Sequence, residues 1–174
     1  MEKLEKQPCG FCHRKTLTLI EDEKEIPYFG KCFIFSMSCS NCNFNKSDIE
    51  SAERKDPSKY TFIVKNKKDL DIRIIKSSEA TIKIPELKVS VTPGPASEGY
   101  ISNIEGILKR FKKIVEQERD STDDNDAKKK AKNLLKKFWK AECGDLSIKV
   151  IIEDPSGNSA IISKEAKVEK IKGK

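Results

Sequence analysis

Two pairs of cysteines near the N-terminus constrain the fold of this chain more than any other feature. Cys9 and Cys12 form one C-x2-C pair, and Cys39 and Cys42 form a second pair after 26 intervening residues. A tetrahedral zinc ion takes four ligands, and a two-residue spacer lets a tight turn direct two sulfurs toward one point. The spacing therefore predicts that one zinc ion is bound by these four thiolates.

Three other uses of the C-x-x-C pattern compete with zinc. His13, the only histidine, follows Cys12 and completes a haem-attachment pattern, but that use requires export and leaves the second pair unexplained. A redox pair begins a helix after a strand, whereas here the first pair precedes a predicted strand. Disulfides are disfavoured because the N-terminus has no apolar signal segment, which predicts a cytoplasmic protein with reduced thiols. Zinc is the favoured interpretation, and His13 stays open as a replacement ligand.

The residues around the two pairs predict a zinc ribbon over residues 1–50. Thr16–Glu21 and Lys31–Ser38 alternate apolar with polar residues, as antiparallel strands do. Pro27 and Gly30 supply a turn between them. The predicted ribbon is therefore a small sheet with the cysteines at its turns.

The two residues that follow the pairs are predicted to adopt left-handed backbone. These are His13 and Asn43, and both residue types are enriched at positive φ among non-glycines.

Cys32 is a poor ligand candidate, because it lies seven residues before Cys39 and side chains at that spacing on a strand point to opposite faces. Cys143 is expected to pack as a small apolar group at a helix end. Four cysteine ligands leave no open position for water, so the predicted site is structural.

The rest of the chain predicts a mainly β body with a helical insertion, an α+β class, over residues 51–163. Residues 45–60 mix charges with a proline and are expected to form a connector. Six later segments alternate apolar with polar residues in the manner of half-buried strands. These segments are Tyr60–Val64, Asp69–Ile75, Ala80–Ile84, Leu87–Val91, Leu146–Ile152 and Ala160–Ser163.

A helical hairpin is predicted at about residues 102–142, between the fourth and fifth of these strands. Ser102 and Glu105 form a capping box, and an apolar stripe at helical spacing runs from there to Val115. The acidic segment 120–126 interrupts the stripe. A second stripe then leads to Phe138 and Trp139, both expected in the core, before Gly144 ends the helix.

The C-terminal segment, residues 164–174, is basic and carries few apolar residues. It is expected to be a frayed extension, with an RNA-binding or partner-binding arm as the alternative. The whole chain has a formal net charge of +7, which favours acidic partners, although scattered lysines also serve solubility.

Four stretches, in this order after the first C-x2-C pair, closely resemble the ZPR-type zinc-finger family. They are IPYFGKCFIFSMSCSNCNF, IRIIKSSEATIKIPEL, GYISNIEGIL and EDPSGNS. The resemblance implies a zinc ribbon followed by a double-stranded β-helix, or β-sandwich, that carries a helical hairpin. It also implies one structural zinc ion on Cys9, Cys12, Cys39 and Cys42. The chain resembles the single-module archaeal form, whereas eukaryotic relatives carry two modules in tandem, and it has His13 and Asn43 where glycine is common in the family.

The family resemblance implies a protein-binding function, with translation elongation factor one-alpha as the partner and assistance in its folding as the role. Phe11 and Phe44 stand in or beside the cysteine turns, where they either anchor a partner or pack the ribbon's own core. Lys128, Lys129 and Lys130 on the second helix are further candidate partner contacts.

The alternative hypothesis is an RNA-binding or ribosome-binding zinc ribbon, although no basic stripe alternates with aromatic residues. Neither catalysis nor a small-molecule substrate is expected. One histidine cannot supply an iron-binding triad of the kind that double-stranded β-helices carry, and no phosphate-binding loop occurs. No apolar run is long enough for a membrane span.

Overall fold

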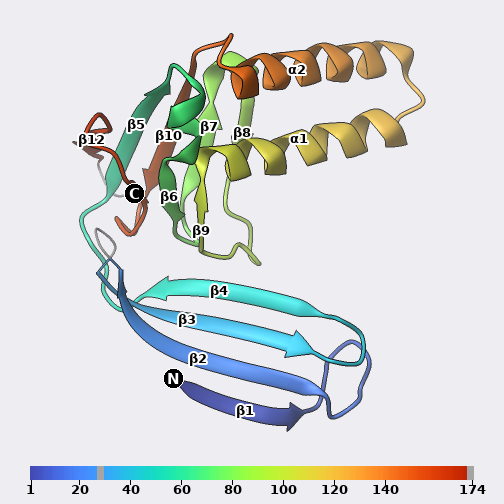
Figure 1. The fold of residues 1–174 in the computed structure, drawn as a ribbon, viewed down its shortest axis with the longest axis vertical. Helices are drawn as coiled ribbons and strands as arrows, with labels where there is room; N and C mark the ends of the chain where they lie inside the picture. The colour runs from blue at the N-terminus through green and yellow to red at the C-terminus, as the bar shows by residue number, and fades with distance from the viewer. Residues whose placement is uncertain (27–29, 172–174) are drawn as a thin grey trace.

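The computed structural model describes residues 1–26 and 30–171, and Figure 1 shows its two layers of β-structure with a pair of helices. The N-terminal layer is an antiparallel sheet of order β1-β2-β3-β4. Its strands are β1 Glu2–Gln7, β2 Leu17–Ile26, β3 Gly30–Cys39 and β4 Asn45–Ser51. The register pairs Leu17 with Cys39, so the start of β2 lies beside the end of β3.

The two central strands of this sheet confirm the sequence prediction, and the two outer strands correct it. Residues 45–51 were expected to belong to a connector, but they pair with β3 and bury Ile49 in a small cluster with Cys32 and Ile75. β1 was not predicted either, because its sequence EKLEKQ holds a single apolar residue. Backbone pairing with an already formed neighbour makes a strand here without an apolar face. The predicted turn residue Pro27 lies outside the described residues.

The second layer is a body of two antiparallel sheets that share one hydrophobic core. The sheets have the orders β12-β5-β10-β7-β8 and β11-β6-β9. Residues of both sheets and of both helices belong to one buried cluster, and β10 alternates buried with half-buried residues along its whole length. The strands are β5 Ser58–Val64, β6 Arg73–Lys76, β7 Thr81–Ile84, β8 Val89–Val91, β9 Tyr100–Asn103, β10 Ile148–Asp154, β11 Ala160–Ile161 and β12 Lys167–Lys170.

Two predicted strands of the body begin later than expected because short 3-10 helices precede them. η1, Lys67–Asp71, is closed by a capping box in which Asn66 and Asp69 exchange hydrogen bonds, so β6 begins only at Arg73. η2, Pro85–Leu87, has proline in its first turn and ends at Lys88 with a φ of 55°. Side-chain capping at η1 and a proline at the start of η2 therefore override the alternating pattern.

The helices form the predicted hairpin, α1 Ile104–Ser121 and α2 Asn125–Cys143. The predicted N-cap is wrong by one residue. Ser102 is paired with Ile74 inside β9, and the next residue, Asn103, caps the helix by accepting a hydrogen bond from Gly106 N at 2.8 Å. Gly144 ends α2 at a φ of 84°, as the sequence predicted.

Only the base of the hairpin is buried in the body. Ile104–Phe111 holds the buried residues of α1, and Phe138 and Ala141 are those of α2. The prediction for Phe138 is confirmed, but Trp139 is 57% exposed, because the next position on a helix turns away from the core. Residues 112–137, here called the hairpin arm, are all described and none is buried. The arm projects beyond the sheets in Figure 1.

The C-terminal segment is not frayed where the structure describes it. Lys167–Lys170 forms β12, an outer strand paired with β5, and Lys170 Nζ contacts Asp56 Oδ2 at 2.6 Å. Residues 172–174 lie outside the described residues. The segment thus extends the larger sheet, which corrects the predicted frayed extension.

A buried carboxylate organises the turn between β10 and β11. Asp154 is 0% exposed and accepts hydrogen bonds from Ser156 N at 2.8 Å, Ser156 Oγ at 2.7 Å and Ser159 Oγ at 2.6 Å. Ser159 Oγ in turn accepts one from Ser77 N at 2.9 Å, which connects the turn to the end of β6. Gly157 has a φ of 70° in this turn. Burial by itself raises the pKa of Asp154, but the hydrogen bonds from Ser159, Ser156 and Ser77 outweigh it and hold the pKa below its usual value.

We predict that Asp154→Asn lowers the free energy of unfolding by about 2 kcal/mol at pH 7, because it leaves buried hydroxyl and amide donors without a charged acceptor. A carboxyl group with a depressed folded-state pKa stabilises the protein above its unfolded-state pKa, and this contribution is lost as the pH falls through the folded-state value. The difference between variant and parent should therefore shrink below about pH 4. Urea unfolding at several pH values measures it, and Asp71→Asn at an exposed position is the control. An equal loss for both variants would contradict the role of Asp154.

Candidate metal centre

The four paired cysteines meet at one end of the N-terminal sheet. Cys9 and Cys12 lie in the turn between β1 and β2, while Cys39 ends β3 and Cys42 lies in the turn before β4. All four sulfurs lie within 4.8 Å of one another. Across the two turns, Sγ of Cys9 is 3.8 Å from Sγ of Cys42, and Sγ of Cys12 is 3.6 Å from Sγ of Cys39. This is the compact set of soft donors that a tetrahedral zinc site requires.

The two cysteine turns have the same backbone geometry. His13 N donates to Cys9 O at 2.8 Å, and Asn43 N donates to Cys39 O at 3.0 Å. The φ angles of His13 and Asn43 are 58° and 56°, so both residues are left-handed as the sequence predicted. His13 is exposed, and the group of possible metal ligands found at this place consists of the four cysteines. His13 thus serves the turn in this structure.

The centre is closed on its inner side by a small apolar cluster. Cys9 and Cys39 are buried, Cys12 is half-buried and Cys42 is exposed. Leu17 is buried beneath the two buried cysteines, with Leu19, Met37 and Phe44 partly covering them. Access to the centre is therefore from the Cys42 side.

The four sulfurs cannot all ionise without a cation. A hydroxyl contact from Thr16 Oγ1, 3.2 Å from Sγ of Cys39, and backbone hydrogen bonds lower the pKa of Cys39 to about 6. A backbone contact from Phe44 lowers the pKa of Cys42, but burial and the three neighbouring sulfurs outweigh it and raise that pKa to about 12. A divalent cation removes this conflict, because a coordinated thiol is deprotonated. The contribution of Thr16 was not predicted, since nothing in the sequence marks a threonine as facing a particular sulfur.

The two remaining cysteines lie outside this centre. Cys32 is fully buried on β3, and its Sγ donates to Lys24 O at 3.1 Å. Burial raises the pKa of Cys32, which keeps it a neutral thiol. Cys143 is half-buried at the end of α2, the position at which the sequence placed it.

The two phenylalanines beside the cysteine turns contact each other and differ in exposure. Their ring centroids are 4.4 Å apart with an interplanar angle of 32°. Phe44 is partly buried against the apolar cluster of the centre, so it packs the ribbon's own core. Phe11 is 71% exposed and covers Phe44 from outside, so it remains available for contact.

The candidate lysines Lys128, Lys129 and Lys130 lie near the start of α2, on the hairpin arm and not at the metal centre. Lys129 and Lys130 are exposed, and Lys128 is half-buried. No helix within residues 1–26 and 30–171 is long and apolar enough to cross a membrane.

Comparisons with protein families match both parts of the chain. Residues 1–57 match the profile described as the ZPR1 zinc-finger domain, and residues 68–173 match the profile described as the ZPR1 jelly-roll domain. A jelly roll is an antiparallel two-sheet fold, in agreement with the sheets of the body. The zinc-finger profile and the four-cysteine cluster together fit one structural zinc ion.

Similar proteins occur in archaea and eukaryotes. A ZPR1-like protein of Methanocaldococcus jannaschii is 36% identical over 99% of this chain and 91% of its own length. One from Pyrococcus horikoshii is 37% identical over 94% of this chain and 75% of its own length. The zinc finger chaperone zpr1 of Schizosaccharomyces pombe is 30% identical over 78% of this chain, which spans 30% of that protein.

We predict that Cys39→Ser abolishes zinc binding and unfolds the N-terminal sheet, while Cys32→Ser keeps about one zinc ion per chain. Both changes replace a buried sulfur on β3 by oxygen, so they differ only in the proximity of the sulfur to the centre. Elemental analysis gives the zinc content, and hydrogen exchange of the β2 and β3 amides reports the loss of structure. Equal zinc content in the two variants would exclude Cys39 as a ligand.

Proposed function

The chain belongs to the ZPR1 zinc-finger family, and from this membership we propose that it is a zinc-stabilised protein-binding module that binds translation elongation factor one-alpha and assists its folding. One Zn²⁺ held by Cys9, Cys12, Cys39 and Cys42 keeps the ribbon rigid. The name of the S. pombe relative, a zinc finger chaperone, supports a role in handling another protein. We place this activity in the cytoplasm, where free thiols stay reduced and available to zinc.

The hairpin arm is the observation that carries this proposal. A helix that packs only its base leaves most of its surface for another molecule, and no residue of the arm is buried. α2 is strongly basic, since its acidic residues are Asp126 and Glu142 alone. Against these stand seven lysines: Lys128, Lys129, Lys130, Lys132, Lys136, Lys137 and Lys140. Such a surface favours an acidic face on the partner.

The ribbon supplies a second contact surface. Phe11, exposed at the tip of the first cysteine turn, is an aromatic side chain on a rigid support, which is the usual form of a binding anchor. In Figure 1 the cysteine end of the sheet and the hairpin arm extend toward the same side of the molecule. A partner that enters from this side can contact both.

Nucleic acid is the second candidate partner, because the lysines of α2 also suit phosphate groups. Attraction to phosphates releases counterions, so the affinity for RNA would fall steeply with salt. The exposed Trp139 is the only tryptophan of α2 and cannot by itself form the series of stacking surfaces that single-stranded RNA requires. The protein partner is therefore favoured over RNA.

We predict that reversing three charges of the arm, Lys128→Glu, Lys129→Glu and Lys130→Glu together, weakens capture of purified elongation factor one-alpha by at least about tenfold. The control variant reverses Lys67, Lys68 and Lys164, three exposed lysines of the body, and gives the same change in net charge. Circular dichroism and zinc content check that both variants are folded.

Equal capture by the two variants would show that the arm does not bind the factor. A parent protein that fails to capture the factor, but binds an RNA oligonucleotide with steep salt dependence, would instead support the nucleic-acid function.

A further inference from the structure

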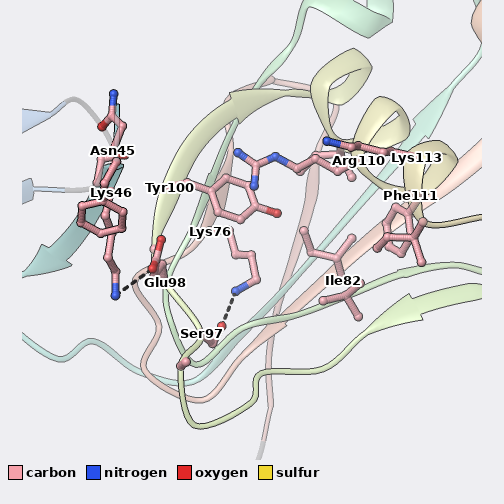
Figure 2. A pocket seen from close by; sticks show the side chains of 17 residues that line it. Asn45, Lys46, Lys76, Ile82, Ser97, Glu98, Tyr100, Arg110, Phe111 and Lys113 are labelled. Atoms are coloured by element: carbon pink, nitrogen blue, oxygen red, sulfur yellow. Dashed lines mark hydrogen bonds and ion pairs between the residues drawn. The ribbon is translucent and has the colours of Figure 1, made fainter. Parts of the chain in front are cut away.

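A cleft of about 790 Å³ separates the N-terminal sheet from the body. One wall comes from the start of β4, including Asn45 and Lys46, and the other from α1, including Arg110 and Lys113. Figure 2 shows these two walls facing each other, with Tyr100 and Lys76 between them. None of the four sulfurs lines the cleft, which shares Phe44 with the apolar cluster of the metal centre and Lys113 and Ile114 with the base of the hairpin arm.

A buried lysine forms the floor of this cleft. Lys76 is 2% exposed, and its Nζ donates to Ser77 O at 2.9 Å and to Ser97 Oγ at 3.3 Å. Both acceptors are neutral, and within the described residues no carboxylate lies within ion-pair distance of this ammonium group. An ammonium group has three donors, so one remains for a ligand. A buried charge without a counterion is costly, so an anionic group placed against Lys76 would lower this cost.

The electrostatics around Lys76 do not remove this cost. Burial lowers the pKa of Lys76, and the positive charge of Arg110 lowers it further, while distant Asp154 and Asp48 counteract these effects only in part. The oxygens of Asp154 are taken up by Ser156 and Ser159, and Asp48 Oδ1 accepts from Gly99 N at 2.7 Å. The position thus lacks a directly contacting anion.

The walls add further positive charge. The Arg110 guanidinium lies over the Tyr100 ring at 4.1 Å from its centroid, and Lys76 Nζ lies 5.6 Å from the same centroid. Arg110 and Lys113 take part in no ion pair among residues 1–26 and 30–171, whereas Lys46 is paired with Glu98 at 2.9 Å. The cleft therefore holds three cations without a paired carboxylate, and Glu98, the one acidic residue among its described lining residues, is already paired with Lys46.

The same cleft also has an apolar side. Ile82, Ile107 and Phe111 form its inner surface, and Ile114 stands 51% exposed at its rim. Inorganic ions would leave this apolar surface uncovered. The mixture of fixed cations and apolar wall suits a ligand with carboxylates and apolar groups on one backbone.

Three sheet edges border the cleft. β4, β8 and β9 are each the outermost strand of their sheet, and each contributes a lining residue, Lys46, Val91 and Tyr100 respectively. An outer strand has backbone donors and acceptors that no neighbouring strand uses, and an extended peptide can pair with them. The geometry thus favours an extended polypeptide over a compact ligand.

The cleft is preformed, because the loop before β9 is fixed to β4. A Cβ atom at Gly99 would lie 2.1 Å from Ile49 O, so the two backbones touch where only glycine fits. The hydrogen bond from Gly99 N to Asp48 and the ion pair between Lys46 and Glu98 hold the same junction. A ligand therefore meets a rigid site, which limits the entropy lost on binding.

We propose that this cleft binds an extended polypeptide segment that places a carboxylate against Lys76, Arg110 and Lys113 and apolar side chains against Ile107, Phe111 and Ile114. The inference rests on the proposed function only in taking a protein as the ligand. RNA is less suited, because Arg110 already covers the ring of Tyr100, the aromatic residue at the centre of the cleft.

The test uses the zinc-loaded full chain and a fluorescein-labelled peptide, Ser-Gly-Val-Glu-Val-Glu-Val-Gly-Ser, whose alternation places carboxylates and valines on opposite faces of an extended strand. Fluorescence anisotropy should give a dissociation constant below about 1 mM, and the analogue with Gln in place of Glu should bind at least about tenfold more weakly. Amide chemical shifts of residues 97–101 should change on addition of the Glu peptide, which locates the binding.

Two matched variants separate the cleft from general charge attraction. Arg110→Gln with Lys113→Gln should weaken peptide binding about tenfold, whereas Lys136→Gln with Lys137→Gln on α2, outside the cleft lining, removes the same charge and should leave binding unchanged. Lys76→Met should also weaken binding, while its thermal midpoint stays equal or rises, because a costly buried charge is replaced by an apolar chain of similar size. A purely structural lysine would give a lower midpoint instead.

The proposal is overturned if the peptide does not bind at about 1 mM, if the Gln analogue binds equally, or if both double variants lose affinity alike. Binding of an RNA oligonucleotide or inorganic phosphate with the same dependence on Arg110 and Lys113, in place of the peptide, would also overturn it. Capture of the elongation factor plays no part in this assay, so its failure would leave the cleft proposal standing.

Discussion

The attraction between one divalent cation and four thiolates is the interaction on which the N-terminal sheet depends. That sheet buries little apolar surface of its own. Beneath the centre lies Leu17 with two of the cysteines, and Ile49 and Cys32 pack farther along toward the body. Without a cation, the neighbouring sulfurs oppose the ionisation of Cys42. Zinc binding stabilises such modules by on the order of 10 kcal/mol. Zinc coordination therefore supplies the folding free energy that the small apolar cluster does not.

The rigid ribbon forms one wall of the cleft above Lys76, so the shape of the cleft depends on the ribbon. Because the backbones of Gly99 and Ile49 are in contact, the position of β4 fixes the position of the loop that contains Ser97, which accepts a hydrogen bond from Lys76. The body keeps its own core and its Asp154 network independent of the metal. Loss of zinc should therefore abolish the cleft and the Phe11 surface first, while the jelly-roll sheets persist.

Periodicity and spacing predicted much of this architecture from the sequence, and what they missed has identifiable causes. The cysteine pairs are recognised by their spacing, and the central strands and the helical hairpin are recognised by the periodic placement of apolar residues along the chain. β1, β4 and β12 were missed because charged strands are formed by pairing with a neighbour and not by their own composition. β9 was missed because the second half of its four residues, YISN, fell within the predicted start of the helical hairpin. The exposure of Trp139 and the burial of Lys76 run against the usual behaviour of their residue types. Both depend on which face of the helix or strand the tertiary fold covers, and the local pattern of a single sequence does not identify that face.

Zinc K-edge X-ray absorption on the protein as isolated tests the central claim most directly, because it identifies the atoms around the metal. The account predicts one zinc ion with four sulfur neighbours at about 2.3 Å and no nitrogen shell. A shell with three sulfurs and one nitrogen at about 2.0 Å would make His13 a ligand, and a folded protein without bound zinc would contradict the account altogether.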